Sequence, residues 1–578
     1  MTTTAVKTTT KLRGLLESLG LFSPPQIDEI MVRHKQAGGS ITDLIALQGY
    51  AKEDVFLETL AKAMGIPFVR VGEMNLSKEL LEKIPTKAVF QYNVIPVSVE
   101  KGVLRVVTHD PFRSGLMDAL KLASGLRVRF SLSPSVELAK ASKKFYGVGA
   151  ETLDQMIADN RIDLDDDSLL KDDLSDLDQE ASVVKFVNQI IWEAHQERST
   201  DIHLEPMETD LRIRYRVDGL LRQTPVPPQV KRFQAAIISR IKVMAGMDIA
   251  DKRMPQDGRI NLKIKGEEID VRVSTVPTVY GESVSLRLLL RSSGALGMDK
   301  LGMNLQDETL LRKLITRPHG ILLVTGPTGS GKSTSLYAWL QTINSINKRI
   351  LTVEDPIEYE MAGINQVLVR PEIELTFAKA LRHFLRQDPD VIMVGEIRDR
   401  ETAQIAIQAS LTGHLVFSTL HTNDAGSAIT RLLDMGIEPF LVASSVEALV
   451  AQRLVRRLCK NCRRPRNLDE PFLAEIGFPL DRLGEGTIFE PAGCEQCMTT
   501  GFKGRTGIYE ILVVNDQIRS LIMSRASASE IKQVAIKNGM RNLRTDGWNK
   551  VLEGTTCIEE VIEATEEDEA LVALQPEA

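Results

Sequence analysis

The sequence has no long uninterrupted run of apolar residues. None of its apolar runs approaches the ~18 to 20 residues that are needed to span a bilayer. The first residues, MTTTAVKTTTK, also lack the hydrophobic core of a secretory signal peptide. We therefore expect a protein that stays on the cytoplasmic side of the membrane.

Cysteine is scarce, with only five in 578 residues. Four of them fall in two C-x-x-C pairs, Cys459 with Cys462 and Cys494 with Cys497, which favours metal binding over disulfides and fits a reducing compartment. Two such pairs can hold one tetrahedral zinc ion, and with no open ligand position the predicted site is structural, although the spacing between the pairs exceeds the compact zinc-ribbon range. Cys557 is isolated, and we expect it to be a small buried residue. Basic residues close in sequence would balance the negative charge of the zinc-bound thiolates: Arg456, Arg457, Lys460, Arg463 and Arg464.

A strongly basic face, the usual mark of a nucleic-acid-binding domain, is not indicated either. The net charge is -7, but residues 151–181 alone carry twelve acids against Arg161 and Lys171, which leaves about +3 for the rest. The sequence also has no signature of a groove in which basic and aromatic residues alternate. We therefore expect no nucleic-acid partner.

The acidic stretch separates two parts of the chain that have regular patterns. Its centre reads DLDDDSLLKDDLSDLDQE, which is self-repelling and poor in aromatic residues, so we expect residues 151–181 to be a flexible linker. The alternative is a solvated surface helix. The abrupt change of composition on both sides favours the linker.

Four regions follow from these patterns. Residues 1–150 alternate helical patterns with short strand-like runs, which predicts a small helical lobe followed by an α+β lobe. After the linker, residues 182–300 contain a helix and several alternating strands, and residues 301–578 repeatedly read strand, loop, helix. Short apolar strands alternating with helices indicate an α/β core with a mostly parallel sheet and helices on both faces.

The stretch ILLVTGPTGSGKSTS contains a complete phosphate-binding loop between a predicted strand and a predicted helix. Backbone N–H groups would surround the phosphates of ATP, Lys332 would bridge the β and γ oxygens, and the hydroxyl of Ser333 would ligate Mg²⁺. The predicted nucleotide-binding residues are Gly326, Pro327, Thr328, Gly329, Ser330, Gly331, Lys332, Ser333 and Thr334.

Hydrolysis also needs acids near the metal and the attacking water. Glu396 ends the apolar strand VIMVGE, and Glu354 and Glu358 follow another apolar strand in TVEDPIE. Each one alone could be a solvated acid, but three at the ends of core strands predict a site. His421 ends a further strand and is placed to sense the γ-phosphate, whereas His414 at its other end could equally be structural.

Several segments, in order and spacing, resemble the secretion ATPase family that powers type II secretion and type IV pilus assembly. They include GPTGSGKSTSLY, LTVEDPIEY, DVIMVGEIRDRETA and TGHLVFSTLHTNDA, with STDIHLEP upstream and GFKGRTGIYEIL downstream. The resemblance covers roughly residues 183 to 565. It implies a RecA-like ATPase domain, a smaller PAS-like α+β lobe before it and a separate N-terminal α+β domain.

The resemblance also implies roles for individual residues. Subunits would form a homohexamer, and Arg272 and Arg287 of the smaller lobe would reach the γ-phosphate on closure. Glu396 would belong to the Walker B motif, Glu354 and Glu358 to an acidic box, and His421 to the histidine box. Which glutamate polarises water and which serves the metal stays open. The zinc insertion at 459–497 favours assembly over pilus retraction.

The N-terminal region resembles the family less closely. Some members bind cyclic di-GMP there through two arginine-leucine-glycine motifs, which would fall at Lys11-Leu12-Arg13 and Gly39-Ser40-Ile41; neither is intact, so this ligand is disfavoured. A regulatory domain on a linker suits docking to a membrane-bound partner. The chain is thus expected to be an ATPase that drives an inner-membrane platform protein in pilus assembly, with type II secretion or a slow nucleotide-responsive scaffold as alternatives.

Overall fold

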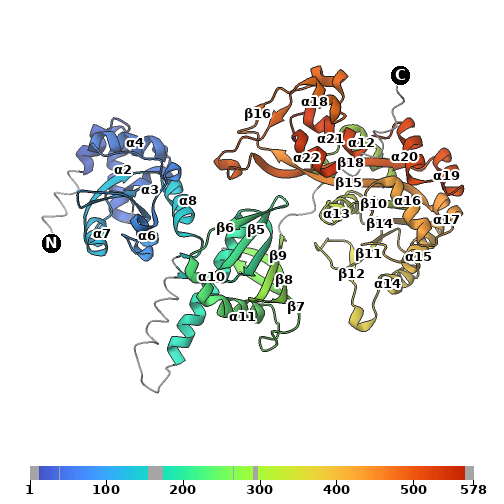
Figure 1. Ribbon diagram of the computed structural model, residues 1–578, viewed down its shortest axis with the longest axis horizontal. Coiled ribbons are helices and arrows are strands. Elements are labelled where there is room, and N and C mark those ends of the chain that lie inside the picture. Colours follow the sequence, from blue (N-terminus) through green and yellow to red (C-terminus); the bar gives the residue numbers. More distant parts are fainter. Residues whose placement is uncertain are drawn as a thin grey trace. The chain divides into compact units, whose positions relative to one another are not determined.

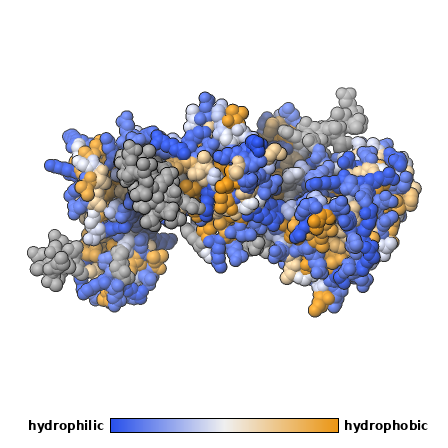
Figure 2. Space-filling model, turned by 90° about the horizontal axis from the view of Figure 1, so that it is seen from below, coloured by the Kyte–Doolittle hydropathy of each residue, from blue (hydrophilic) through white to orange (hydrophobic). Residues whose placement is uncertain are grey.

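The computed structural model describes residues 12–37, 40–150, 152–153, 173–264, 266–290 and 297–565. The chain divides into two compact units, Met1–Leu289 and Leu290–Ala578, whose elements are labelled in Figure 1. Among the described residues, no helix is both long enough and apolar enough to cross a bilayer. The face of the molecule drawn in Figure 2 is mostly hydrophilic, with apolar residues gathered in separate patches.

The first unit begins with a layer of short helices. These are α2 (Pro24–Ala37), α3 (Ile41–Leu47) and α4 (Glu53–Met64). In α4 the apolar residues Phe56, Leu57 and Leu60 recur at helical spacing, and all three are buried. The helix ends at Gly65, whose φ of 64° lies in the left-handed region that glycine adopts without strain.

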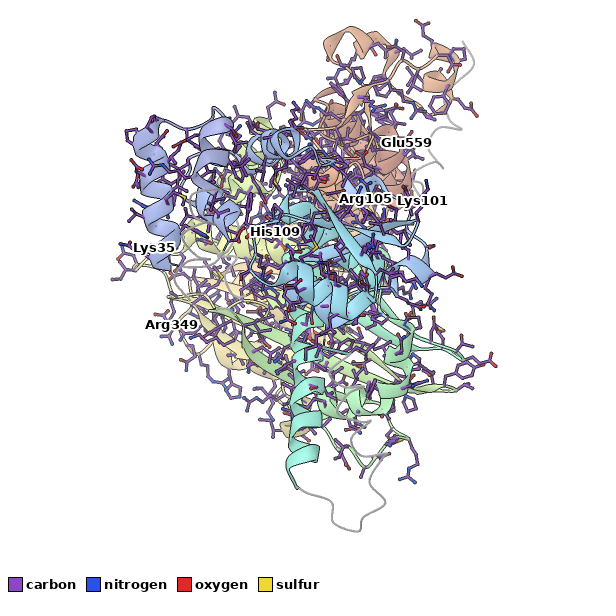
Figure 3. The ribbon with its side chains drawn as sticks, turned by 90° about the vertical axis from the view of Figure 1, so that its left-hand side faces the viewer. Lys35, Lys101, Arg105, His109, Arg349 and Glu559 are labelled. Carbon is purple, nitrogen blue, oxygen red and sulfur yellow. The ribbon has the colours of Figure 1, made fainter. Side chains whose placement is uncertain are left out.

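A three-stranded sheet with helices around it follows the helical layer. The strands, in sheet order, are β1 (Val94–Glu100), β2 (Val103–Thr108) and β3 (Arg127–Leu132), and the helices are α5 (Lys78–Leu81), α6 (Thr86–Tyr92), α7 (Leu116–Ser124) and α8 (Ser135–Tyr146). His109 (Figure 3) follows β2, is only 8% exposed, and places Nε2 3.6 Å from Oδ1 of Asp43 in α3. This contact joins the helical layer to the predicted α+β layer.

The second part of this unit is a six-stranded sheet covered on one face by two helices. Its order is β6-β5-β4-β9-β8-β7, formed by β4 (Ser199–Pro206), β5 (Leu211–Val217), β6 (Leu220–Thr224), β7 (Gln256–Ile264), β8 (Glu267–Thr278) and β9 (Gly281–Leu290). Leu211, Ile213 and Tyr215 alternate with less buried arginines and join one hydrophobic core with residues of α10 (Asp173–Gln196) and α11 (Gln234–Met244). The alternation of apolar and polar residues that predicted these strands thus places the apolar residues on the face that the helices cover.

Both ends of the predicted linker differ from the structure. Thr152 and Leu153 are helical, and Leu153 belongs to the hydrophobic core of the six-stranded lobe. Helix α10 begins at Asp173, so the alternative of a helix holds from that residue onward; extending a helix back from a packed segment is much less costly than starting a new one. Residues 151 and 154–172 of the predicted linker lie outside the described residues.

The second unit is built on a seven-stranded sheet in the order β12-β11-β13-β14-β10-β15-β18. The strands are β10 (Gly320–Thr325), β11 (Ile350–Glu354), β12 (Asn365–Leu368), β13 (Val391–Val394), β14 (Leu415–Leu420), β15 (Val446–Leu458) and β18 (Phe502–Val513). All neighbours are parallel except β15 and β18, which are antiparallel.

Helices cover both faces of this sheet. Leu322 and Val324 of β10 share a core with Trp339 of α13 (Lys332–Ile343), whereas Ile321 and Leu323 share another with the helices of the opposite face. On the α13 side lies α12 (Leu305–Leu314), and on the other side lie α14 (Phe377–Phe384), α15 (Arg400–Leu411), α16 (Ala425–Asp434) and α17 (Pro439–Ser445). The prediction of a multidomain α/β protein with a mostly parallel core sheet is confirmed.

The cysteine-containing segment is an insertion between the two antiparallel strands. It follows Leu458 at the end of β15 and ends before Phe502 at the start of β18, with α18 (Glu470–Glu475) and the small pair β16 (Arg464–Pro465) and β17 (Phe489–Glu490) inside it. The C-terminal helices are α19 (Asp516–Met523), α20 (Ala528–Lys537), α21 (Leu543–Leu552) and α22 (Ile558–Thr565).

Candidate active site

The phosphate loop lies at the carboxyl end of β10, where three glycines have positive φ. The values are 150° at Gly326, 82° at Gly329 and 90° at Gly331. A Cβ at Gly326 would lie 2.6 Å from the carbonyl oxygen of Gln452, and one at Gly331 would lie 2.8 Å from its side-chain nitrogen. Both positions therefore require glycine, for conformation and for space.

The remaining loop residues differ in exposure. The tip of the loop is exposed and consists of Pro327, Thr328 and Gly329, whereas Ser330 is buried. Ser333 and Thr334 lie in the first turn of α13, where the unpaired backbone N–H groups and the helix dipole favour an anion. The geometry fits a bound polyphosphate.

Lys332, the first residue of α13, lies against this loop. Its Nζ donates to the carbonyl oxygens of Gly326 at 2.7 Å and Pro327 at 3.0 Å. Burial lowers the pKa of Lys332 to about 8; the negative charge of Glu396 opposes this shift, and Arg453 adds to it. The lysine is therefore close enough to Glu396 to feel its charge.

Glu396 follows β13 and is held between two basic side chains. Its Oε2 lies 3.1 Å from Nε2 of His421, and its Oε1 pairs with Arg398, a hydrogen bond that raises the pKa of Arg398. The carboxylate is 12% exposed and His421 is 49% exposed. Two residues that were predicted separately from the ends of β13 and β14 are thus brought together beside the phosphate loop.

Glu354 ends β11 in a different setting. It is 4% exposed and accepts hydrogen bonds from Tyr337 Oη, from Thr352 Oγ1 at 2.6 Å and from Gln366 Nε2 at 3.1 Å. Glu358 lies four residues further on, half-buried, and its backbone N–H donates to Tyr337 Oη at 3.1 Å. Of the two acidic-box glutamates, Glu354 is enclosed by neutral donors and Glu358 is the more accessible.

Gln452 is a residue of this site that sequence reasoning missed. Besides its contacts with the loop glycines, its Oε1 accepts from Ser335 Oγ of α13 at 2.7 Å. The sequence signal was a glutamine in the run ALVAQRLV, which is apolar except for Gln452 and Arg453. The structure leaves Gln452 only 1% exposed.

The ends of two parallel strands are also joined by threonines that the sequence did not single out. The hydroxyls of Thr325 on β10 and Thr422 after β14 lie 2.5 Å apart, and Thr422 N donates to Thr325 Oγ1 at 3.0 Å. This link holds the loop that carries His421 beside the phosphate loop. Nothing in the local sequence distinguishes these threonines from other polar strand ends.

Arg272 and Arg287 lie on β8 and β9 of the first unit, on the face of the six-stranded sheet opposite its helices. Arg287 Nε lies 3.0 Å from Oδ1 of Asp201, whose Oδ2 lies 3.7 Å from Nε of Arg216. Arg272 is paired in register with Arg259 of β7. The two predicted arginines thus belong to a strongly polar sheet face, and their role at the nucleotide remains a proposal.

His414 lies at the amino end of β14, the end opposite the phosphate loop. Its Nδ1 lies 2.8 Å from the carbonyl oxygen of Ala409 and 3.2 Å from Thr412 Oγ1. These contacts fit the structural alternative for this histidine.

The four predicted cysteine ligands lie together. Their Sγ atoms are all within 4.8 Å of one another, with 3.8 Å between Cys459 and Cys494 and 3.7 Å between Cys462 and Cys497. Zinc–sulfur bonds of about 2.3 Å in a tetrahedron give sulfur–sulfur separations of about 3.8 Å, so the cluster fits zinc.

Donors around two of the sulfurs favour thiolates. Hydrogen bonds led by that of Asn461 lower the pKa of Cys494 to about 6, and Gly501 N donates to Cys497 Sγ at 3.2 Å. Burial instead raises the pKa of Cys462 to about 11, although Gly493 N donates to its Sγ at 3.2 Å. Zinc bound there would fix the fold of the insertion.

Two of the basic residues expected to balance the cluster's charge are engaged elsewhere. Arg456 pairs with Glu560 of α22 and stacks on Phe502, with 4.0 Å from its guanidinium carbon to the ring centre. Arg463 donates to the carbonyl oxygen of Gly554. Arg456 thus ties β15, and Arg463 the insertion, to the C-terminal helical region.

Most of the chain matches known protein families. A family model described as "Type II/IV secretion system protein" matches residues 176–563, and one described as "MshEN domain" matches residues 64–152. The first match covers both the six-stranded lobe and the second unit.

Curated relatives match nearly the whole length. The type IV pilus assembly ATPase PilB of Myxococcus xanthus is 41% identical over 566 residues, which are 96% of this chain and 99% of that protein. The type II secretion system protein E of Xanthomonas campestris is 43% identical over 557 residues, 93% of this chain and 96% of that protein. The corresponding protein of Aeromonas hydrophila is 52% identical over 397 residues, 69% of this chain and 78% of that protein.

Proposed function

The chain belongs to the type II/IV secretion system protein family and is an ATPase, and we propose that it is the cytoplasmic motor of type IV pilus assembly. The observation that carries the proposal is the arrangement of Lys332, Glu396 and His421 around a complete phosphate loop. The near full-length similarity to a pilus assembly ATPase supports the choice of system.

ATP would bind with its phosphates along the loop and the N-terminus of α13. Ser333 would hold Mg²⁺, which neutralises phosphate charge, while Lys332 would bridge the outer phosphates. Glu396 and Glu358 would divide the work of orienting the attacking water and the metal, with His421 beside the γ-phosphate. Arg272 and Arg287 would add positive charge as the smaller lobe closes, which stabilises the transferring phosphoryl group and couples hydrolysis to movement.

The working assembly is proposed to be a homohexamer at the inner face of the inner membrane. Closure and opening of its subunits would drive a platform protein in that membrane, which inserts pilin subunits into the growing filament. The N-terminal domain would dock on a membrane-bound partner. Cyclic di-GMP remains the disfavoured ligand for this domain, since both of its sequence motifs are broken.

Type II secretion is the second candidate, favoured by the 43% identity to a type II secretion protein over 93% of this chain. There the same motor would assemble a pseudopilus instead of a surface pilus. A slow nucleotide-responsive scaffold is the remaining alternative, and intact Lys332, Ser333 and Glu396 argue against it.

Replacing the native gene with a Glu396→Gln allele tests the proposal. Surface pili are scored by electron microscopy and exoproteins are measured in the medium of the same cultures. The matched control is Glu372→Gln, which changes an exposed acid in the short 3-10 helix Pro371–Ile373 after β12. Lost pili with normal export support the pilus motor. Normal pili with trapped exoproteins would assign the chain to type II secretion, and no defect in either would contradict both.

A further inference from the structure

Tyr337 is a buried tyrosine on α13, the helix that starts at the phosphate loop, five residues after Lys332. It is 2% exposed, and its ring meets that of Tyr359 edge to face, with 5.5 Å between ring centres. Tyr359 lies in the segment 355–361, directly after β11, which also carries Glu358. The tyrosine thus stands between the phosphate-loop helix and the acidic box.

The hydroxyl of Tyr337 both donates and accepts hydrogen bonds at this position. It donates to Glu354 Oε2 and accepts from the backbone N–H of Glu358 at 3.1 Å and, at a longer 3.5 Å, from that of Tyr359. Burial and the nearby charge of Glu354 raise the pKa of Tyr337 far above its usual range, so the hydroxyl keeps its proton. It therefore acts as a permanent bridge between the carboxylate and the backbone of the acidic segment.

Gln366 on β12 completes the network from the other side. Its Nε2 donates to Glu354 Oε1 at 3.1 Å and to the carbonyl oxygen of Tyr359 at 2.9 Å, and its Oε1 accepts from Met361 N at 2.7 Å. The acidic segment is thus held by its backbone at Glu358, Tyr359 and Met361. Each holding group connects to Glu354, whose carboxylate is the centre of the network.

We propose that Tyr337 is a positioning residue for ATP hydrolysis, which fixes the backbone of Glu358 relative to the helix that begins with Lys332. Gln366 assists it, and Glu354 serves as the hub of the network instead of contacting the attacking water. A small displacement of a group that must face the reacting phosphate lowers the rate of the chemical step more than it lowers nucleotide affinity. The inference rests on the proposed function, because it assigns a role within the ATPase reaction.

Tyr337→Phe in the purified full-length chain tests this role, because it removes the hydroxyl and keeps the ring. Tyr215→Phe is the matched control: Tyr215 of β5 is also buried, at 1% exposed, but its hydroxyl donates to the carbonyl oxygen of Ile190 at 3.1 Å, within the core of the six-stranded lobe. Gln366→Met is a second variant, which keeps the length of the side chain and removes its hydrogen bonds. We measure kcat and KM for ATP, binding of a fluorescent nucleotide analogue and the midpoint of thermal unfolding.

The expected result is a kcat about 10-fold lower in Tyr337→Phe and Gln366→Met, with KM and nucleotide affinity within about twofold of the wild type. Tyr215→Phe should keep the wild-type kcat per bound nucleotide, whatever its melting temperature. A wild-type kcat in Tyr337→Phe would overturn the inference, as would equal losses in Tyr337→Phe and Tyr215→Phe. A wild-type chain that binds ATP without cleaving it would instead contradict the proposed function itself.

Discussion

Glu354 and Glu396 each follow an apolar core strand, yet their surroundings differ in kind. Glu396 is 12% exposed and lies between His421 and Arg398. Glu354 is 4% exposed and is surrounded by the neutral donors of Tyr337, Thr352 and Gln366. A carboxylate whose partners are exposed and basic can exchange them for a metal or water, whereas one enclosed by buried donors holds its neighbours in place.

The largest expected effect comes from Glu396→Gln, which removes the charge beside Lys332. We expect kcat for ATP to fall on the order of 100-fold or more, because the substitution removes an electrostatic group from the site of phosphoryl transfer. Nucleotide binding should persist. A steady-state phosphate-release assay measures the loss, and a kcat near the wild-type value would remove Glu396 from the reaction.

Glu354→Gln should have a smaller effect of a different kind. The amide places an N–H donor where the wild type has an acceptor, so one buried donor loses its partner at a cost of about 1–3 kcal/mol in stability. We expect kcat to fall about 10-fold with KM for ATP little changed. Steady-state kinetics measures the change in kcat, and thermal unfolding measures the change in stability. If kcat fell as far as in Glu396→Gln while stability stayed unchanged, the two glutamates would have equivalent roles.

The pH dependence of nucleotide affinity separates the two carboxylates further. The pKa of Lys332 is about 8 in the folded chain, so its positive charge, and with it the affinity for phosphates, should fall as pH rises through about 8. Glu396 raises this pKa, so Glu396→Gln should move the fall to lower pH, whereas Glu354→Gln should leave it in place. Titration of a fluorescent nucleotide at a series of pH values tests this.

Stability should move in the opposite direction over the same range. An unfolded lysine keeps its proton up to about pH 10.5, so between about 8 and 10.5 the unfolded chain binds more protons than the folded one. The contribution of Lys332 to the free energy of unfolding therefore rises with pH there. A parallel fall of affinity and stability would mean that the chain is unfolding and not that Lys332 is titrating.

The smallest effect on turnover is expected from Cys494→Ser. This variant gives a reference for the two glutamates, because it should lower stability without changing the active site. One zinc ligand is removed far along the chain from both glutamates, so bound zinc should be lost and the midpoint of thermal unfolding should fall by several degrees. We expect kcat per folded chain to stay within about twofold. Zinc content by atomic absorption, together with calorimetry, checks the outcome, and a zinc-free wild type would contradict the metal site.

Local requirements explain what could be predicted from the sequence. The glycines of the phosphate loop, the period of strands such as β5 and the paired cysteines are each dictated by a few neighbouring residues. The positions of Gln366 and Tyr337 depend on contacts with residues distant in the sequence, so no local pattern revealed them. A glutamine in a mostly apolar run marks Gln452 as unusual, but the run does not show that it lies beneath the phosphate loop. Asp173 was assigned to a linker for the same reason, because its charge is local whereas the helix it begins is stabilised by packing further along.

Strand β15 connects the phosphate loop with the cysteine cluster, two features that the sequence analysis treated separately. Gln452, beneath the phosphate loop, and Cys459, in the metal cluster, lie on one continuous stretch of chain that is paired with β18 through Arg456 and Leu458. An extended strand of seven residues spans about 23 Å. A pull along this strand loads its cross-strand hydrogen bonds in shear, so they resist together instead of opening one at a time. The pairing of β15 with β18 therefore gives one continuous stretch of hydrogen-bonded backbone from the phosphate loop to the cysteine cluster, along which a load at the cysteine end would reach the nucleotide site.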